Sequence, residues 1–245
     1  MPRVTVLGSG DAFGAGGRLF GCYLVETRSA TFLLECSPSV LQGLKRVPCD
    51  PGRIDFVLVS HFHGDHFGGV PFLLMEYRYQ RPRTRPLALY GPSGLRGRVE
   101  DLFAALYRRI AAMEAPFEVT YDEVRPGTPF RARDVLIEPF GVSHVPELSC
   151  LGYRLTADGK TICFSGDSVW SPELKAAAEG ADLFLCECST YETQLDIHVA
   201  YPDVAAEAAS LGCSRIVLTH LGEEVLARQS SVTLECATDG MTIEL

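Results

Sequence analysis

The sequence lacks several features that would assign it to a broad functional class. It is acidic, with 22 Lys and Arg residues against 31 Asp and Glu and a formal net charge of −9, which excludes the basic footprint of a general nucleic-acid coat protein. No apolar run approaches the roughly 18 residues of a membrane span, so none is expected. Asparagine is absent and Arg far outnumbers Lys, but codon bias in a GC-rich genome explains this as well as heat adaptation does.

An export signal and a disulfide framework are missing too. Residues 1–7 are too soon interrupted for a signal peptide. The nine cysteines are odd in number and scattered, so we expect reduced thiols in a cytoplasmic protein. Cys186 and Cys188 lack the Cys-x-x-Cys spacing, which favours packing over metal or redox chemistry. A length of 245 residues with 47% hydrophobic content predicts one domain, residues 1–245, with a substantial core.

The most informative stretch is the hexapeptide HFHGDH at residues 61–66. It follows an apolar run, residues 55–60, that is short enough to be a buried strand. Three imidazoles and a carboxylate at the end of a strand suit Zn²⁺ and neighbouring first-row metals. In a loop, His61 and His63 can turn to one ion while Asp65 and His66 face a second. The segment therefore predicts a site for two metal ions.

The pattern of the whole chain predicts two sheets. Strand patterns dominate its first two thirds, and helices and strands alternate afterwards, which fits two sheets faced by outer helices. We expect strands at residues 3–7, 22–26, 31–35, 55–60, 117–121, 135–140, 151–155, 161–164, 183–186 and 215–218, and helices at 38–45, 70–79, 94–113, 172–179 and 202–211. Leu95, Val99, Leu106 and Ile110 would line one face of the helix at 94–113.

The HxHxDH motif after a buried strand resembles the signature of the metallo-β-lactamase superfamily. This resemblance implies an α/β (α+β) fold, the four-layer αββα sandwich, with metals at one edge between the two sheets. His144, Asp167 and His220 each follow a predicted strand and match the later ligand positions of that family in order and context. Five of the six histidines in the chain thus fit the pattern.

The resemblance divides the donors into two sets joined by one carboxylate. One set is His61, His63 and His144, and the other is Asp65, His66 and His220. Asp167 bridges the two sets. The expected cofactor is a pair of divalent ions, Zn²⁺ in the first place, with Mn²⁺ or Fe²⁺ left open. Such ions share a water or hydroxide, lower its pKa and polarise the group under attack, while Asp65 or Asp167 orients the nucleophile. This predicts a hydrolase that needs no organic cofactor.

Two further residues lie at positions that resemble those of functional residues in the ribonuclease Z-like branch of the superfamily. Glu187 follows the strand at 183–186, and His198 precedes the helix at 202–211. In ribonuclease Z a Glu in a similar position pairs with a His that acts as general acid, and the resemblance implies these roles for Glu187 and His198. An imidazole is suited to protonating an alkoxide that leaves phosphorus, and a neighbouring carboxylate favours its charged form. The expected function is a dinuclear-metal phosphodiesterase.

The sequence also departs from ribonuclease Z. The interval from His144 to Asp167 is too short for the long arm that grips transfer RNA, and Val199 and Ala200 replace a Thr and a Ser. This argues against transfer-RNA processing and favours a small phosphodiester, such as a cyclic nucleotide or a cyclic ribosyl phosphate. The alternative is hydrolysis of carboxylic or sulfuric esters, lactones or thioesters on the same two metals.

Three features stay open. Residues 8–18 form a glycine-rich loop like that of ribonuclease Z-like proteins, and Asp11 in it is either an acceptor for a ligand imidazole or a turn residue. The Arg-rich region from Arg78 to Arg98 either grips an anionic substrate or is a solvated face. A homodimer is common in the resembling branch, and the aromatic-rich helix at 70–79 is a candidate contact.

Overall fold

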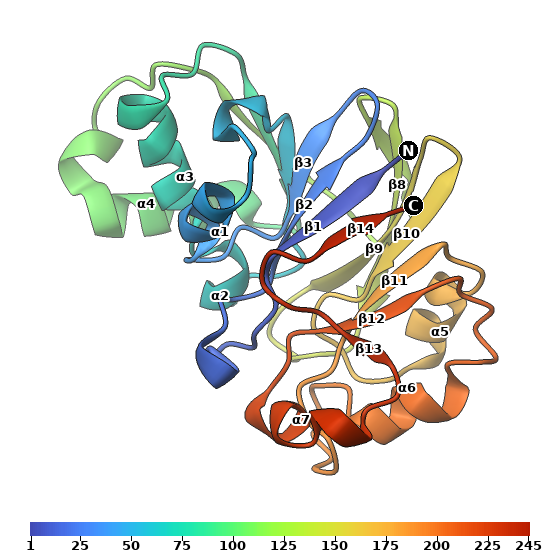
Figure 1. The fold of residues 1–245 in the computed structure, drawn as a ribbon. Coiled ribbons are helices and arrows are strands. Elements are labelled where there is room, and N and C mark those ends of the chain that lie inside the picture. The colour runs from blue at the N-terminus through green and yellow to red at the C-terminus, as the bar shows by residue number, and fades with distance from the viewer.

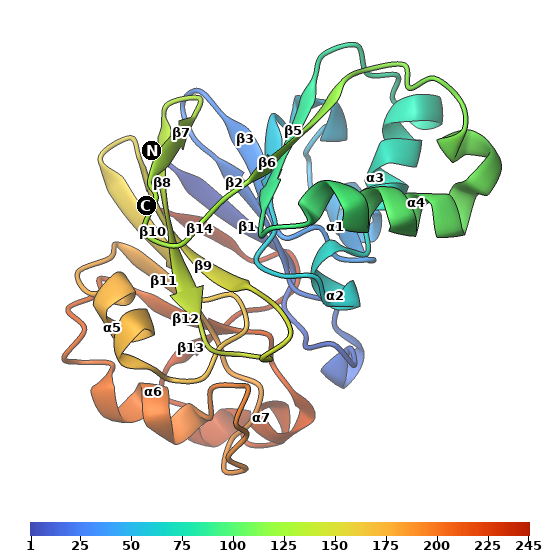
Figure 2. The ribbon, with the colours of Figure 1, turned by 180° about the vertical axis from the view of Figure 1, so that it is seen from behind.

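The computed structural model describes all 245 residues as two seven-stranded sheets packed face to face, with helices on their outer faces (Figure 1). The first sheet has the order β14-β1-β2-β3-β4-β5-β6, and the second has the order β13-β12-β11-β10-β9-β8-β7. Figure 2 shows α1 to α4 gathered beside the first sheet and α5 to α7 beside the second. This confirms the predicted αββα layering.

The elements have the following bounds. The first sheet contains β1 (Arg3–Gly8), β2 (Cys22–Glu26), β3 (Thr31–Leu34), β4 (Phe56–Leu58), β5 (Leu87–Gly91), β6 (Val119–Glu123) and β14 (Thr242–Glu244). The second contains β7 (Phe130–Ala132), β8 (Val135–Val142), β9 (Cys150–Ala157), β10 (Lys160–Phe164), β11 (Leu183–Glu187), β12 (Ile216–Thr219) and β13 (Glu235–Cys236). The helices are α1 (Val40–Arg46), α2 (Gly64–Phe67), α3 (Val70–Met75), α4 (Leu95–Ala111), α5 (Pro172–Ala178), α6 (Tyr201–Glu207) and α7 (Glu223–Ala227).

Buried apolar side chains form three layers. One cluster lies between the sheets and includes Phe32, Phe56 and Tyr153, and the other two lie between each sheet and its helices. Every residue of β4 and β11 is buried, as expected of parallel strands that are covered on both faces. The continuous apolar runs in the sequence therefore mark the central strands that lead into the predicted metal loop and to Glu187.

Helix α4 differs from its prediction in its packing. Its backbone leaves helical geometry at Tyr107, with φ −135° and ψ 51°. Of the predicted apolar face, Leu95 and Val99 are buried, but Leu106 is 48% exposed. Figure 1 shows α4 at the outer margin of the molecule, and both buried residues of α4, Leu95 and Val99, lie in its first half. Periodicity predicted the helix correctly and overestimated how much of it is buried.

Some elements were not predicted. The alternating strand β5 lies inside the Arg-rich region, where charge and proline obscured it, and the short elements β7, β13, β14 and α7 were also missed. The helix predicted at 70–79 divides into α3 and the π-helical turn η3 (Glu76–Gln80). None of the helices combines the length and apolar sequence that crossing a bilayer would require.

Gly69 allows the segment after the HFHGDH motif to pack against the loop after β3. Its N–H donates to Cys36 O at 2.7 Å, and a Cβ on Gly69 would lie 1.9 Å from Ser37 O. A Cβ on Gly64 would meet no atom within 4 Å. We expect Gly69→Ala to lower the free energy of unfolding by about 2–3 kcal/mol, because backbone must move to admit the methyl group.

The matched control is Gly64→Ala, which should change stability by less than about 0.5 kcal/mol. Urea unfolding of the two variants measures the difference. Equal effects would contradict the close approach at Gly69.

Candidate metal centre

The predicted site residues meet at one edge of the sandwich, where strands end. β4 leads into the HFHGDH motif, β8 into His144, β10 into Asp167 and β12 into His220. β10, β11 and β12 are parallel neighbours, so their carboxyl ends lie side by side. This is the edge at which α/β sheets commonly bind ligands.

Donor atoms form two groups that overlap at Asp167, each with its atoms within 4.8 Å of one another, and a further group of Glu187, His198 and His220 overlaps the second at His220. The first group is His61, His63, His144 and Asp167, and the second is Asp65, His66, Asp167 and His220. Asp167 belongs to both, and its Oδ2 lies 3.2 Å from His66 Nε2 and 3.4 Å from His220 Nε2. The groups have the same members, and the same shared carboxylate, as the two sets predicted from the sequence.

Hydrogen bonds orient three of the imidazoles through the nitrogen that faces away from the cluster. His144 Nδ1 donates to Ile197 O at 2.7 Å. His61 Nδ1 lies 2.9 Å from the neighbouring Ser60 hydroxyl, and His220 Nδ1 lies 2.9 Å from Ser189 Oγ. Each bond fixes the ring and leaves Nε2 for the cluster, which is the arrangement that metal-ligating histidines use.

Glu35 is a site residue that the sequence analysis missed. It is fully buried directly after β3, in the left-handed region with φ 66°, and both carboxylate oxygens accept from Ser60 N–H at 3.2 Å. Glu35 Oε1 lies 3.6 Å from His66 Nδ1. Burial raises the pKa of the Glu35 carboxyl above its ordinary value, although His66 opposes the shift. The available signal was an acid directly after a strand that is apolar except for Thr31.

Burial and mutual charge pull the pKa values of the cluster apart. Burial lowers the pKa of His61 and of His144. Burial also opposes ionisation of Asp167 and His220, but neighbouring imidazoles hold the pKa of the Asp167 carboxyl well below its usual range, and Asp167 and Asp65 raise the pKa of His220 to about 9. Only histidines form ion pairs with the Asp65 and Asp167 carboxylates.

Glu187 and His198 form a hydrogen-bonded pair beside this cluster. Glu187 Oε1 lies 2.8 Å from His198 Nδ1, and it also accepts from Ser168 N–H at 2.8 Å. The His198 ring lies 4.9 Å from the ring of His144 and 5.4 Å from that of His220. Burial would lower the pKa of His198, but the hydrogen bond and charge of Glu187 raise it above 6.5. The pair can therefore hold a proton next to the donor groups.

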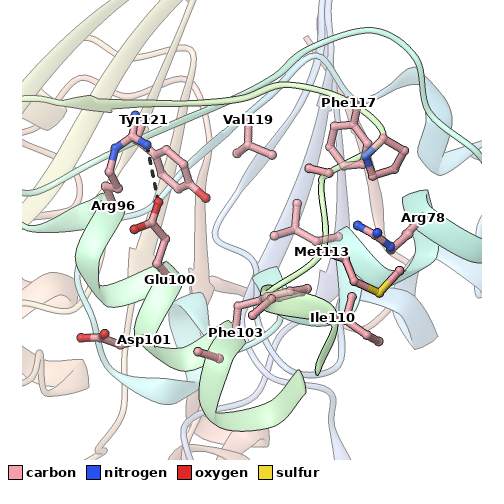
Figure 3. A pocket seen from close by; sticks show the side chains of 15 residues that line it. Arg78, Arg96, Glu100, Asp101, Phe103, Ile110, Met113, Phe117, Val119 and Tyr121 are labelled. Carbon is pink, nitrogen blue, oxygen red and sulfur yellow. Dashed lines mark hydrogen bonds and ion pairs between the residues drawn. The ribbon is translucent and has the colours of Figure 1, made fainter. Parts of the chain in front are cut away.

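The Arg-rich region lies apart from the donor groups. Arg83 and Arg85 donate to backbone carbonyl oxygens of neighbouring turns. Arg78 and Arg96 line a mainly apolar cavity of about 530 Å³ beside α4 and β6, where Arg96 pairs with Glu100 (Figure 3). None of these four arginines forms a hydrogen bond or ion pair with a residue of the cluster.

The contacts of Asp11, Cys186 and Cys188 are structural. Asp11 Oδ1 accepts from Phe13 N–H and Ala15 N–H, both at 3.0 Å, so its contacts are those of a turn residue. Cys186 and Cys188 are buried, and burial raises the pKa of both thiols. A raised pKa disfavours the thiolate that metal binding or redox chemistry requires.

Residues 30–221 match the family model described as the Beta-lactamase superfamily domain. The chain belongs to the β-lactamase superfamily. A superfamily relative, ribonuclease Z of Mycobacterium marinum, is 26% identical over 249 residues, which span 94% of this chain and 89% of the relative.

Two solved structures share the superfamily fold with this chain. The short form of human tRNase Z has a TM-score of 0.80 and 24% identity, with 99% of this chain and 98% of that chain covered. A diphosphatase of the PhnP family has a TM-score of 0.79 and 18% identity, with 100% and 98% covered. These comparisons confirm the predicted fold and the ribonuclease Z-like resemblance. The named relatives are hydrolases of the superfamily, which confirms the prediction of an enzyme of this kind.

Proposed function

We propose that this β-lactamase superfamily member is a dinuclear-metal phosphodiesterase that acts on a small phosphodiester. The observation that carries the proposal is the pairing of two donor groups, which share Asp167, with a Glu187–His198 pair less than 5.5 Å away by ring centroids. The two donor groups suit metal-assisted hydrolysis, and the Glu187–His198 pair suits protonation of a leaving oxygen.

The residues at the edge of the sheets fit a pair of divalent ions. Nε2 of His61 and both ring nitrogens of His66 are buried without a hydrogen-bond partner. Buried polar atoms rarely stay unpaired, and an ion coordinated by Nε2 accounts for two of these three. The proposed ligands are His61, His63 and His144 for one ion, Asp65, His66 and His220 for the other, and Asp167 for both. Imidazole with carboxylate is a donor set that suits Zn²⁺, with Mn²⁺ and Fe²⁺ as alternatives.

When bound, such ions lower the pKa of water and stabilise charge on the phosphoryl oxygens. The chain's own residues supply the rest. Asp65 Oδ2, which lies 3.0 Å from His66 Nε2, is placed to accept a hydrogen bond from the attacking water and orient it. His198 Nε2 donates a proton to the leaving oxygen. Glu187 binds Nδ1 of the same ring and so keeps the proton-donating nitrogen turned away from itself.

A small substrate is supported by the connections around the site. Residues between His144 and Asp167 form only β9, β10 and three short links, which leaves no protruding arm for transfer RNA. The relatives named ribonuclease Z, tRNase Z and diphosphatase support a phosphodiester or nucleotide substrate. A cyclic nucleotide or a cyclic ribosyl phosphate is both small and a phosphodiester. Hydrolysis of esters, lactones or thioesters on the same metals is the alternative, and the Glu187–His198 pair disfavours it for thioesters, because a thiolate leaves without a proton.

The homodimer predicted from the resemblance has one supporting feature. Leu106 and Met113, on and just after α4, are 48% and 53% exposed, and Met113 lines the apolar cavity of Figure 3. An exposed apolar surface of this kind is typical of a protein contact.

Metal analysis followed by a substrate panel tests the proposed function. We expect about two divalent ions per chain, and turnover of bis-p-nitrophenyl phosphate and of a cyclic nucleotide. Chelation should abolish both activities, and Zn²⁺ should restore them. Circular dichroism of the chelated protein controls for unfolding. Turnover of a lactone or thioester with neither phosphodiester hydrolysed would overturn the proposal.

A further inference from the structure

One loop, residues 189–200, supplies contacts to both the donor groups and the proposed acid. Ile197 O accepts from His144 Nδ1 at 2.7 Å, and the next residue is His198. Ser189 Oγ lies 2.9 Å from His220 Nδ1 and donates to Glu187 Oε2 at 3.0 Å. The loop has no helix or ladder of its own beyond isolated bridges that pair Thr190 with Ala200 and Leu195 with His198. Within the loop the Thr190 hydroxyl donates to Thr193 O at 2.6 Å, and contacts from outside add to this bond.

The carboxylate of Glu224 makes these outside contacts. Glu224 Oε2 accepts from three consecutive backbone N–H groups of the loop, Tyr191 at 2.8 Å, Glu192 at 3.2 Å and Thr193 at 3.2 Å. Its Oε1 accepts from the Thr193 hydroxyl at 3.1 Å. Consecutive N–H groups that converge on one point form an anion-binding concavity, and here a side chain of the same protein fills it. Hydrogen bonds to an ionised acceptor are the stronger kind.

Glu224 itself is fixed relative to the donor groups. It is the second residue of α7, which begins three residues after His220. Gly222 packs so closely on the loop that a Cβ there would lie 2.1 Å from Ser189 O. Arg228, one turn further along the chain, lies 3.8 Å from Glu224 Oε1 and 5.2 Å from the Tyr191 ring centre. Glu224 therefore connects the segment that carries His220 to the loop that carries His198.

We propose that Glu224 is a positioning residue, which holds the loop so that His198 can donate its proton. The inference rests on the proposed phosphodiesterase function. Glu224 touches neither the donor groups nor the place of the leaving oxygen, so it acts through the loop. Its loss should affect the proton-donating step more than the rest of the site, because His198 belongs to the loop whereas the seven proposed ligands lie on other segments.

Substrates that differ in their leaving group test this role. We expect Glu224→Ala to lower kcat about tenfold for a cyclic nucleotide, whose alkoxide needs a proton, and less than about twofold for bis-p-nitrophenyl phosphate, whose nitrophenolate does not. In a His198→Ala background the same substitution should cause no further loss. Glu224→Gln keeps one acceptor oxygen, so its kcat for the cyclic nucleotide should lie between those of the parent and Glu224→Ala. Glu192→Gln is the matched control, because it removes a loop charge that pairs with Arg228 and leaves the backbone contacts intact, and both activities should stay within twofold.

Amide hydrogen exchange provides a second readout that needs no activity. In Glu224→Ala we expect faster exchange at residues 191–193 and also at 196–199. Equal losses on the two substrates, a further loss in the His198→Ala background, or faster exchange confined to 191–193 would each overturn the positioning role. A parent protein that hydrolyses neither phosphodiester would refute the proposed function instead, and the exchange pattern would still decide whether Glu224 orders the distant end of the loop.

Discussion

Asp167→Asn is expected to lower phosphodiester turnover by about 1000-fold or more and to reduce the bound metal to less than half of the parent content. Asp167 is 3% exposed, and four imidazoles lie within 4.0 Å of its Oδ2. Replacing a partner that only orients a ligand costs about 10–100-fold in metal affinity, so removing a shared ligand should cost more. Loss of one preorganised charge contact alone costs about 100–1000-fold in turnover.

Asparagine preserves the shape of Asp167, removes its charge and replaces one acceptor oxygen with an NH2 group. Elemental analysis of the purified variant and turnover of bis-p-nitrophenyl phosphate give the two measurements. Asp122→Asn, an exposed Asp on β6, is the control for the same chemical change, and its metal content and activity should match the parent. A fully metal-loaded and active Asp167→Asn protein would refute the shared-ligand assignment.

His198→Ala is expected to produce the second largest effect. A positioned general acid contributes about 100–10,000-fold, so turnover of a cyclic nucleotide should fall by that factor while turnover of bis-p-nitrophenyl phosphate falls much less. The substitution leaves all seven proposed ligands in place, so metal content should not change. Undiminished turnover of the cyclic nucleotide would refute the acid assignment.

The pH dependence gives an independent measurement on His198. Glu187 raises the pKa of this imidazole above 6.5, so the proton-donating form persists to a higher pH than an ordinary histidine allows. Turnover that needs this proton should fall as pH rises through the raised pKa. His198→Ala should lose this alkaline limb for the cyclic nucleotide. For bis-p-nitrophenyl phosphate the parent and the variant should have similar profiles above pH 6.5.

Local sequence predicted the parts of the site that are local in the chain. The HFHGDH motif carries four donors in six residues, and the apolar run before it identified β4. His144, Asp167 and His220 are single residues at strand ends, and only the topology of the second sheet brings them to the motif. The resemblance supplied that topology, because a lone His or Asp carries no signal for its distant partners.

The missed residues act through the backbone of other segments. Glu35 binds the N–H of Ser60 across neighbouring strands, and Glu224 binds three N–H groups of a loop some thirty residues earlier in the chain. Such a side chain produces no periodicity or motif in the sequence, because its partners are backbone N–H groups, which every residue except proline has. The exposed half of α4 shows the opposite error, since an amphipathic pattern states which face is apolar and not whether anything covers it.

The division of the donors between the two sheets has a consequence during protein synthesis. His61 to His66 leave the ribosome early, whereas Asp167 and His220 follow only after most of the second sheet has been translated. Translation proceeds at about 5–20 residues per second, so the nascent chain spends several seconds or more with half of its donors exposed. A chain at that stage lacks Asp167 and His220 of the proposed ligands, and it also lacks the proton donor His198. On the proposed function, hydrolytic competence therefore arises only after His220, the last of the proposed ligands, has been translated.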